Sequence, residues 1–391
     1  MKRIAVIFEG RINERMGVFN AVLNRVLHLR RVASYDIDVH MIQVYDGALM
    51  RRLRGTESTG SRPGQLDIDG IQFHMHWFKR SWSDVMRHRL LDEQPQNFFR
   101  WLDNLASQFD GYDFLSAHDR IGGIVAQHAA QRFGIPHSIT WHGTSIHTDP
   151  MISDNLRNTT IELLHGARYN FFVSRELQAR AQQLTADFKG EILYNGASRM
   201  FSRYSDDERR RLRVLHHVLD RKVVAFVGRF EPIKNVTLLP QIFTIIAKKY
   251  DQPVTFWTIG TGIQHEEVRQ EFAHNGIDCR MWGMQPLDVM PQLMNCIDVL
   301  VLPSKFEGLP LVTLEALQCG ANVVASNVVG TAEGIGRENA IDIDEHFLEN
   351  FTDRAIEMLQ GKVKQSLPPH ISWEATAQKE NNIYLQLMGG E

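Results

Sequence analysis

The sequence predicts an α/β protein with two doubly wound, Rossmann-like domains in tandem, each built on a parallel sheet that helices cover on both faces. The length, 391 residues, is more than twice the ~150 residues of a typical single domain. Short, continuously apolar segments alternate with helical patterns in both halves, which is typical of parallel strands buried on both faces. The composition, 43% apolar and 23% charged, excludes a disordered or collagen-like chain.

The first half contains segments with the pattern of buried strands. They are residues 4–8, 38–44, 114–118, 138–142, 170–174 and 191–194. Apolar residues recur at helical spacing from residue 18 to residue 29, and a second helix over 123–133 ends at Gly134. The polar segment 51–70 predicts an exposed loop.

The second half repeats this alternation. Its strand patterns are residues 222–228, 254–260, 298–303 and 322–326. A linker near residues 197–203 therefore divides a first domain, residues 1–200, from a second, residues 201–372. The remaining segment, residues 373–391, has a helical pattern that suits either domain.

Three features bear on the compartment. The longest apolar runs, such as residues 223–227, are far shorter than the ~20 residues of a membrane span. The acidic Glu9 leaves no room for the apolar core of a secretion signal, so we expect none. The three cysteines, Cys279, Cys296 and Cys319, are odd in number and lack metal-ligand spacing. We therefore expect free thiols and a cytoplasmic protein.

Charge divides unevenly along the chain. Residues 1–200 carry 24 Lys and Arg against 21 Asp and Glu, whereas the rest carries 19 against 25. The basic half suits an anionic partner, such as the cytoplasmic membrane surface or an acidic acceptor, but ordinary scatter of surface charge explains it equally well. Residues 73–90 interleave aromatic with basic residues, which suits either a membrane-facing surface or a half-buried helix.

Ligands of doubly wound domains bind at the carboxyl ends of the strands, so the residues that follow the strands are the candidates for function. Glu307 and Glu315 stand eight residues apart after the strand over 298–303. Gly308 lets a ligand approach the backbone, and Pro310 suits the start of a helix whose amides can bind phosphate. Glu315 can accept hydrogen bonds from a diol such as ribose.

Two cations follow the strand over 222–228. Arg229 and Lys234 lie in one loop, where they can neutralise a pyrophosphate. Taken alone, the pair also suits two solvated surface charges.

Several motifs in fixed order resemble the donor domain of the retaining GT-B glycosyltransferases of family 4. They are Gly-Arg…Lys at 228–234, Ile-Gly-x-Gly at 259–262, Trp-Gly at 282–283, and Leu-Pro-Ser-x-x-Glu-Gly-Leu-Pro-Leu at 302–311 with Glu315 beyond it. The first half is similar at Trp-His-Gly, 141–143, and Asn-Gly, 195–196, but has Met16-Gly17 where the family often has paired glycines. The dense match covers about residues 220–336.

The resemblance implies a GT-B fold with a cleft, an acceptor domain at 1–200, a nucleotide-sugar domain at 201–372, and a last helix that crosses back. It implies a catalytic group of His142, Glu307, Arg229 and Lys234. The implied donor-binding residues are Gly17, Arg229, Lys234, Gly260, Gly262, Met284, Glu307, Gly308, Leu309, Pro310, Leu311 and Glu315. His118 is a weaker second candidate beside His142.

The implied reaction moves a sugar, with retention, from a UDP- or GDP-sugar to a saccharide or lipid-linked acceptor in bacterial surface-polysaccharide synthesis. It needs no cofactor and no metal, and nucleic acid is not an expected partner. His74 and His76 are interpreted as surface or loop residues rather than metal ligands. A sugar-nucleotide epimerase and a catalytically silent partner subunit remain as alternatives, whereas a phosphorylase would need a pyridoxal-phosphate lysine that is not evident.

Overall fold

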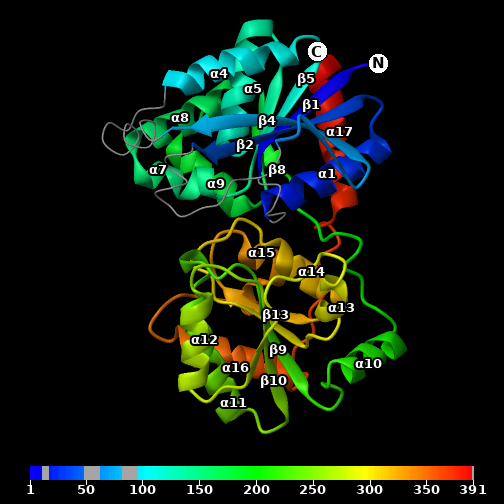
Figure 1. Cartoon of the computed structure of the whole chain (residues 1–391), viewed down its shortest axis with the longest axis vertical. Coiled ribbons are helices and arrows are strands. Elements are labelled where there is room, and N and C mark those ends of the chain that lie inside the picture. The colour runs from blue at the N-terminus through cyan, green and yellow to red at the C-terminus, as the bar shows by residue number, and fades with distance from the viewer. Residues whose placement is uncertain (11–16, 48–61, 82–95, 390–391) are drawn as a thin grey trace. The chain divides into compact units, whose positions relative to one another are not determined.

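The computed structural model describes residues 1–10, 17–47, 62–81 and 96–389, and the chain divides into two compact units (Figure 1). Unit 1 is Met1–Tyr194 with Glu374–Glu391, and unit 2 is Asn195–Trp373. The first boundary thus follows Tyr194, a few residues before the expected linker. Gly196 lies directly against the backbone of Ser372 and Trp373, so the two connections between the units run side by side.

In the described part of unit 1, one sheet has the strand order β3-β4-β2-β1-β5-β6-β7-β8. Its strands are β1 (Arg3–Glu9), β2 (Asp36–Asp46), β3 (Gln65–Ile68), β4 (Ile71–Arg80), β5 (Phe114–His118), β6 (His137–Trp141), β7 (Tyr169–Phe172) and β8 (Gly190–Ile192). Neighbouring strands are parallel except for the antiparallel pair β3 and β4. The strand order reverses between β1 and β5, which is where a doubly wound domain binds its ligand.

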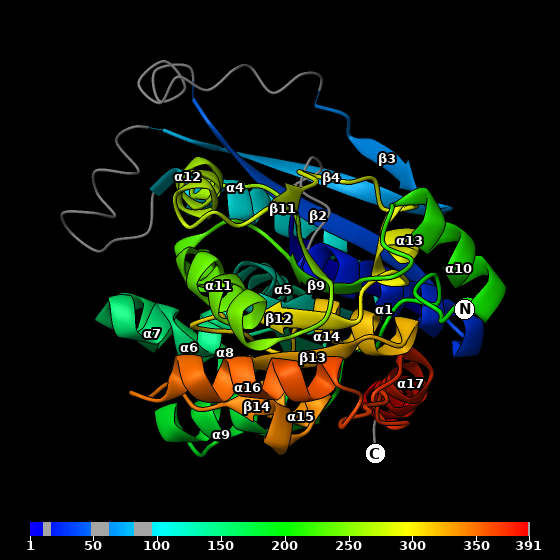
Figure 2. The same ribbon diagram turned by 90° about the horizontal axis from the view of Figure 1, so that it is seen from below.

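Helices cover both faces of this sheet (Figures 1 and 2). They are α1 (Val18–Val32), α4 (Gln96–Ala106), α5 (Asp119–Phe133), α6 (Thr144–His147), α7 (Asp149–Ile152), α8 (Asp154–Gly166), α9 (Arg175–Leu184) and α17 (Trp373–Gly389). α1 and α17 share one apolar core with β1 and β5, through residues such as Val22, Phe114 and Tyr384. α5 packs on β1, β5 and β6 and contacts α4 and α8.

A buried polar network joins α17 to the rest of unit 1. The Arg25 guanidinium lies 3.6 Å from the Glu380 carboxylate, and both side chains are at most 1% exposed. Tyr384 donates a hydrogen bond to Glu380 at 2.6 Å and accepts one from Ser116 at 2.6 Å. Arg25 also donates to Thr140 Oγ1 at 3.0 Å. Burial raises the pKa of Glu380, while Arg25 and Tyr384 act in the opposite direction.

Unit 2 contains a parallel sheet with the order β11-β10-β9-β12-β13-β14. Its strands are β9 (Lys222–Val227), β10 (Val254–Ile259), β11 (Cys279–Met281), β12 (Val299–Leu302), β13 (Asn322–Ser326) and β14 (Ala340–Ile341). Its helices are α10 (Asp206–Leu215), α11 (Leu239–Lys249), α12 (His265–His274), α13 (Met290–Met294), α14 (Leu311–Cys319), α15 (Thr331–Ile335) and α16 (Phe347–Leu359). α11 packs against α12 and α16, and α14 packs against α13 and α15. The order reverses between β9 and β12.

Two predictions about the first half are wrong. Residues 65–68, expected in a loop, form β3, and residues 71–80, for which a half-buried helix was considered, form β4. Ile71, Phe73 and Met75 are buried at alternate positions, so the pattern has the period of a strand. The aromatic and basic residues at 82–90 lie outside the described residues, as does most of the expected loop.

The interpretation of His76 as a surface or loop residue is also wrong. Its side chain is buried, and its Nε2 lies 3.0 Å from Nδ1 of His40 on the neighbouring strand β2. Burial lowers the pKa of His76 to about 4, and the charge of His74 acts in the same direction. This pair is therefore neutral near pH 7 and contributes to sheet packing.

The structure agrees with two expectations from the sequence, that the cysteines are free thiols and that the apolar runs are too short to span a membrane. All three cysteines are free thiols, and burial raises the pKa of Cys296 to about 11. Within the described residues, no helix combines the length and the apolar character needed to cross a membrane.

The buried network predicts a large difference between neighbouring substitutions on α17. We expect Glu380→Ala to lower the free energy of unfolding by about 3–5 kcal/mol, because it leaves the Arg25 charge buried and unpaired. Lys379→Ala is the matched control, since the Lys379–Glu191 ion pair is 44% exposed on both sides. Its loss should cost at most about 1 kcal/mol. Urea denaturation measures both, and equal losses would contradict a dominant role for the network.

Candidate functional site

Two loops meet at the point where the strand order of unit 2 reverses. One follows β9 and carries Arg229 and Lys234, and the other follows β12 and carries Glu307. The backbone N–H of Lys305 donates to the carbonyl oxygen of Ile233 at 2.8 Å. The Lys234 ammonium donates to Glu307 Oε1 at 2.6 Å. The structure thus brings together two of the residues predicted to be catalytic.

Some charged side chains of these loops are paired with each other, whereas others have no ion-pair partner among the described residues. Lys234 and Glu307 form an ion pair whose side chains are 18% and 9% exposed, so each offsets the desolvation cost of the other. Arg229 has an exposed side chain and no ion-pair partner in the described part of the chain. Lys305, in the second loop, is likewise exposed and has no ion-pair partner among the described residues, so the positive charges that these loops leave available for an anion are those of Arg229 and Lys305.

The amino end of α14 lies directly after Glu307. Leu309 is buried, Pro310 precedes the first helical residue, and α14 begins at Leu311. The first amides of a helix have no partner within the helix, and they carry a partial positive charge. The side chain of Glu315, in the next turn, forms no hydrogen bond or ion pair with any described residue. Burial raises the pKa of Glu315 to about 7.

Gly260 and Gly262 lie against the backbone of the loop that carries Arg229. A Cβ at Gly262 would lie 2.5 Å from the carbonyl oxygen of Phe230, and Gly260, at φ +129°, lies against the backbone of Gly228. The backbone N–H of Phe230 donates to the carbonyl of Thr261 at 3.0 Å. These glycines therefore permit close approach of two loops, and the contacts that the structure gives them are with protein backbone.

The segment 282–284, which contains the predicted donor-binding residue Met284, has a packed indole and an exposed methionine. Arg280 stacks on the Trp282 ring at 3.7 Å, and Trp257 packs against its edge. The Nε1 atom of Trp282 is buried without a hydrogen-bond partner. The side chain of Met284 is 55% exposed, so it is not packed into the protein as the Trp282 ring is.

In unit 1, three polar residues gather where β5 and β6 end. His118 Nδ1 lies 2.9 Å from His142 Nε2, and Asp119 Oδ1 accepts a hydrogen bond from the His142 backbone N–H at 3.0 Å. Asp119 adopts a left-handed conformation at φ 52°. Burial lowers the pKa of His142 to about 3 and raises that of Asp119 to about 7. Both histidines are thus neutral near pH 7, and His118 lies in contact with the predicted residue.

Gly17 lies at the amino end of α1, at φ 59°, with open space where a Cβ would stand. The charged residues that precede it lie outside the described residues.

Sequence reasoning missed Asp119 and Arg25. An arginine within the apolar stripe of α1 was the available signal for Arg25, and a His-Asp pair directly after a strand was the signal for Asp119.

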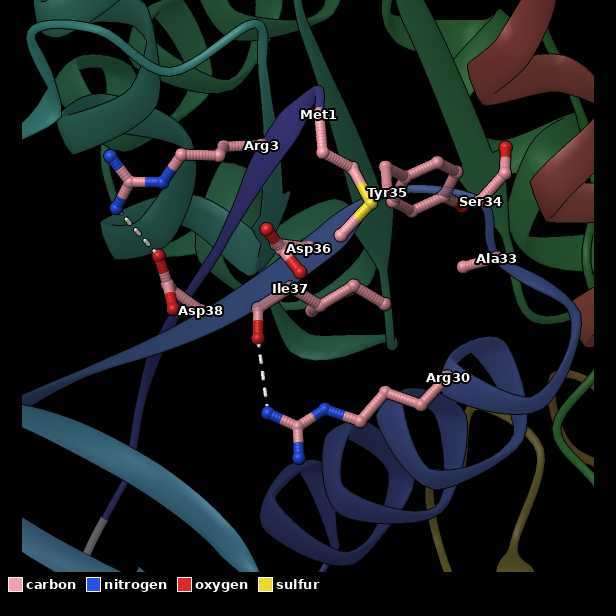
Figure 3. Close-up of a pocket in the computed structure, with 9 residues that line it drawn as sticks. All are labelled: Met1, Arg3, Arg30, Ala33, Ser34, Tyr35, Asp36, Ile37 and Asp38. Carbon is pink, nitrogen blue, oxygen red and sulfur yellow. Dashed lines mark hydrogen bonds and ion pairs between the residues drawn. The ribbon is translucent and has the colours of Figure 1, made fainter.

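A hollow of about 560 Å³ lies at the opposite, amino ends of β1 and β2 (Figure 3). Three of its charged side chains have protein partners: Arg3 pairs with Asp38 at 2.9 Å, and Arg30 donates to the Ile37 carbonyl at 3.1 Å. Doubly wound domains bind their ligands at the carboxyl ends of the strands, so we do not place the site in this hollow. No group of three or more potential ligands suited to a metal ion occurs among the described residues.

Comparison with known proteins identifies relatives of both sequence and fold. Residues 221–361 match the model of the family described as Glycosyl transferases group 1. An uncharacterized glycosyltransferase of Methanocaldococcus jannaschii is 23% identical over 82% of this chain and 91% of its own. The O-antigen chain mannosyltransferase B of Escherichia coli is 28% identical over 41% of this chain and 44% of its own.

Solved structures resemble the chain over its whole length. HepE of Anabaena, solved with UDP and glucose, has a TM-score of 0.66 at 17% identity and covers 99% of this chain and 100% of its own. Sucrose-phosphate synthase from Thermosynechococcus elongatus has a TM-score of 0.72 at 17% identity, with complete coverage of both chains. At these identities the similarity shows the fold alone.

The loop contacts predict unequal effects of two glycine substitutions. We expect Gly262→Ala to lower the free energy of unfolding by about 2–3 kcal/mol, because the added methyl group meets backbone that must shift. Gly64→Ala is the control, since nothing lies within 4 Å of its Cβ position. Its effect should stay within about 0.5 kcal/mol. Urea denaturation of both variants measures the difference, and a tolerated Gly262→Ala would contradict the close approach of the loops.

Proposed function

Because residues 221–361 match the group 1 glycosyltransferase model and the chain has the GT-B fold, we propose that it is a retaining glycosyltransferase that uses a UDP- or GDP-sugar donor. The acceptor that we propose is a saccharide or a lipid-linked saccharide. The observation that carries this proposal is the joining of the Arg229 and Glu307 loops at the reversal point of unit 2, beside the amino end of α14. HepE, which shares the fold, was solved with UDP-glucose.

The donor diphosphate would lie between these groups. Arg229 offers a guanidinium fork, and the first amides of α14 offer further donors. Lys234 has three N–H donors, of which Glu307 accepts one, so the others remain for phosphate oxygens. We propose that these groups take the negative charge of the leaving diphosphate, and that the reaction therefore requires neither a metal ion nor another cofactor.

Retention follows if the incoming hydroxyl attacks from the face that the diphosphate leaves. The bond from the anomeric carbon to the phosphate oxygen breaks, and a bond to the acceptor oxygen forms on the same face. The departing phosphate oxygen takes the acceptor proton, so atoms and charges balance. His142 would hydrogen-bond the transferred sugar, Glu307 would contact it while paired with Lys234, and Glu315 would accept hydrogen bonds from the ribose hydroxyls.

The pathway that we propose is the synthesis of a bacterial surface polysaccharide at the cytoplasmic face of the membrane. Relatives named for O-antigen and teichuronic acid synthesis support it, at 28% and 25% identity. The basic character of residues 1–200 suits an anionic, lipid-linked acceptor or the membrane surface itself. An epimerase would instead release an altered sugar without an acceptor, and a silent subunit would bind no nucleotide sugar.

Donor turnover tests the proposed site. With UDP-glucose as the first probe, we expect Arg229→Ala to reduce nucleotide release about 100-fold, because it removes charge stabilisation of the leaving group. Glu315→Ala should weaken donor binding about tenfold while the melting temperature stays unchanged. Arg269→Ala is the control, since its exposed pair with Glu266 lies outside the site. Unchanged turnover in both site variants would refute the assignment, and a thermal-shift panel of nucleotide sugars would identify the preferred donor.

The raised pKa of Glu315 predicts pH-dependent donor affinity. Burial raises the pKa of this carboxyl group to about 7, and its ionised form accepts hydrogen bonds from the two ribose hydroxyls through both oxygens and more strongly than the protonated form. Its ionised fraction rises from about 10% at pH 6 to about 90% at pH 8, so UDP-glucose should bind about tenfold more tightly at pH 8. The diphosphate of UDP-glucose does not titrate in this range. Calorimetry should find this dependence absent in Glu315→Gln, and an equal dependence there would exclude Glu315 as its source.

A further inference from the structure

The hydrogen bond between His118 and His142 fixes one nitrogen of each ring. His118 Nδ1 lies 2.9 Å from His142 Nε2, and the ring planes differ by 24°. His118 is 1% exposed, and its other nitrogen, Nε2, is buried without a hydrogen-bond partner. The other nitrogen of His142, Nδ1, is not among the buried unpartnered atoms and forms no hydrogen bond with a described residue. Since His142 is half-buried rather than fully buried, this nitrogen is available to a ligand.

Two neutral proton arrangements are compatible with this bond. If His118 donates from Nδ1, its buried Nε2 is a bare lone pair and His142 carries its proton on Nδ1. If His142 donates from Nε2, His118 carries a proton on its buried Nε2 and His142 presents a lone pair at Nδ1. The two arrangements give His142 opposite chemistry toward a ligand.

The burial of His118 decides between them. The second arrangement leaves an N–H group buried without an acceptor, whereas the first leaves an unused lone pair, which native structures tolerate better. Arg25 lies near both rings, and its positive charge lowers the pKa of both histidines. A positive charge beside the His118 ring also favours a lone pair over a further N–H.

We propose that His118 is a positioning residue that holds the proton of His142 on Nδ1, so that His142 donates a hydrogen bond to an oxygen of the bound sugar. This inference rests on the proposed function for the identity of the ligand. His142 is then a donor and not a general base, because His118 occupies its Nε2 lone pair and its Nδ1 carries the proton. The ligand class that this nitrogen recognises is a hydroxyl or ring oxygen.

Substitutions at His118 separate positioning from packing. The side-chain amide introduced by His118→Asn can present an N–H in place of the Nδ1 proton, whereas His118→Asp offers only acceptor oxygens at pH 8 and so favours the proton of His142 on Nε2. We expect His118→Asn to keep kcat/KM for UDP-glucose within about threefold of the parent, and His118→Asp to lower it about tenfold. If His118→Asp does not fold, His118→Leu, which removes the donor, should show a similar loss.

Nitrogen-15 NMR of histidine-labelled protein at pH 8 tests the tautomer without turnover. We expect His142 to carry its proton on Nδ1 in the parent and in His118→Asn, and on Nε2 in His118→Asp. A parent protein with the His142 proton on Nε2 would overturn the inference, as would equal kcat/KM in the Asn and Asp variants. An Nδ1 tautomer in a protein that turns over no nucleotide sugar would support the positioning role and refute the proposed function.

Discussion

Burial of both faces of each parallel sheet is the constraint on which the rest of the structure depends. A strand covered on both sides carries polar side chains only where they find buried partners, as Ser116 and Thr140 do, so other charged and hydrogen-bonding side chains collect where the strands end. In unit 2 this brings the loops after β9 and β12 together at the reversal point, and in unit 1 it brings together the residues after β5 and β6. The site residues are thus placed by sheet topology rather than by proximity in sequence.

The same constraint explains why α17 belongs to unit 1. Its apolar face completes the core beside α1, yet the helix also buries Glu380, which would be costly without a partner. Arg25 supplies that partner from α1 and contacts β6 through Thr140. The position of Arg25 near His118 and His142 means that the network holding α17 also sets part of the electrostatic environment of the candidate site.

The sequence was informative wherever one pattern dominated. Continuous apolar runs predicted strands such as β9, β10 and β12. The helical spacing of apolar residues predicted α1. In these segments the apolar residues serve only to pack the core, so their spacing reports the secondary structure directly. β4 was missed because His74, His76 and the following aromatic and basic residues obscure its alternation, and their burial depends on the neighbouring strand β2. The Lys234–Glu307 pair was not foreseen, since two loops separated by 73 residues meet only through the topology of the sheet.

Charge is largely neutralised around the candidate groups within each unit. Lys234 offsets Glu307, burial keeps His118 and His142 neutral, and burial moves the pKa of Glu315 and Asp119 to about 7. Since an unpaired buried ion destabilises a fold, this neutralisation lets each unit bury its own polar groups at modest cost. Arg229 differs because it is exposed and water solvates its charge. Lys305 is likewise exposed, so unit 2 keeps its unpaired cations in water and its buried charges paired.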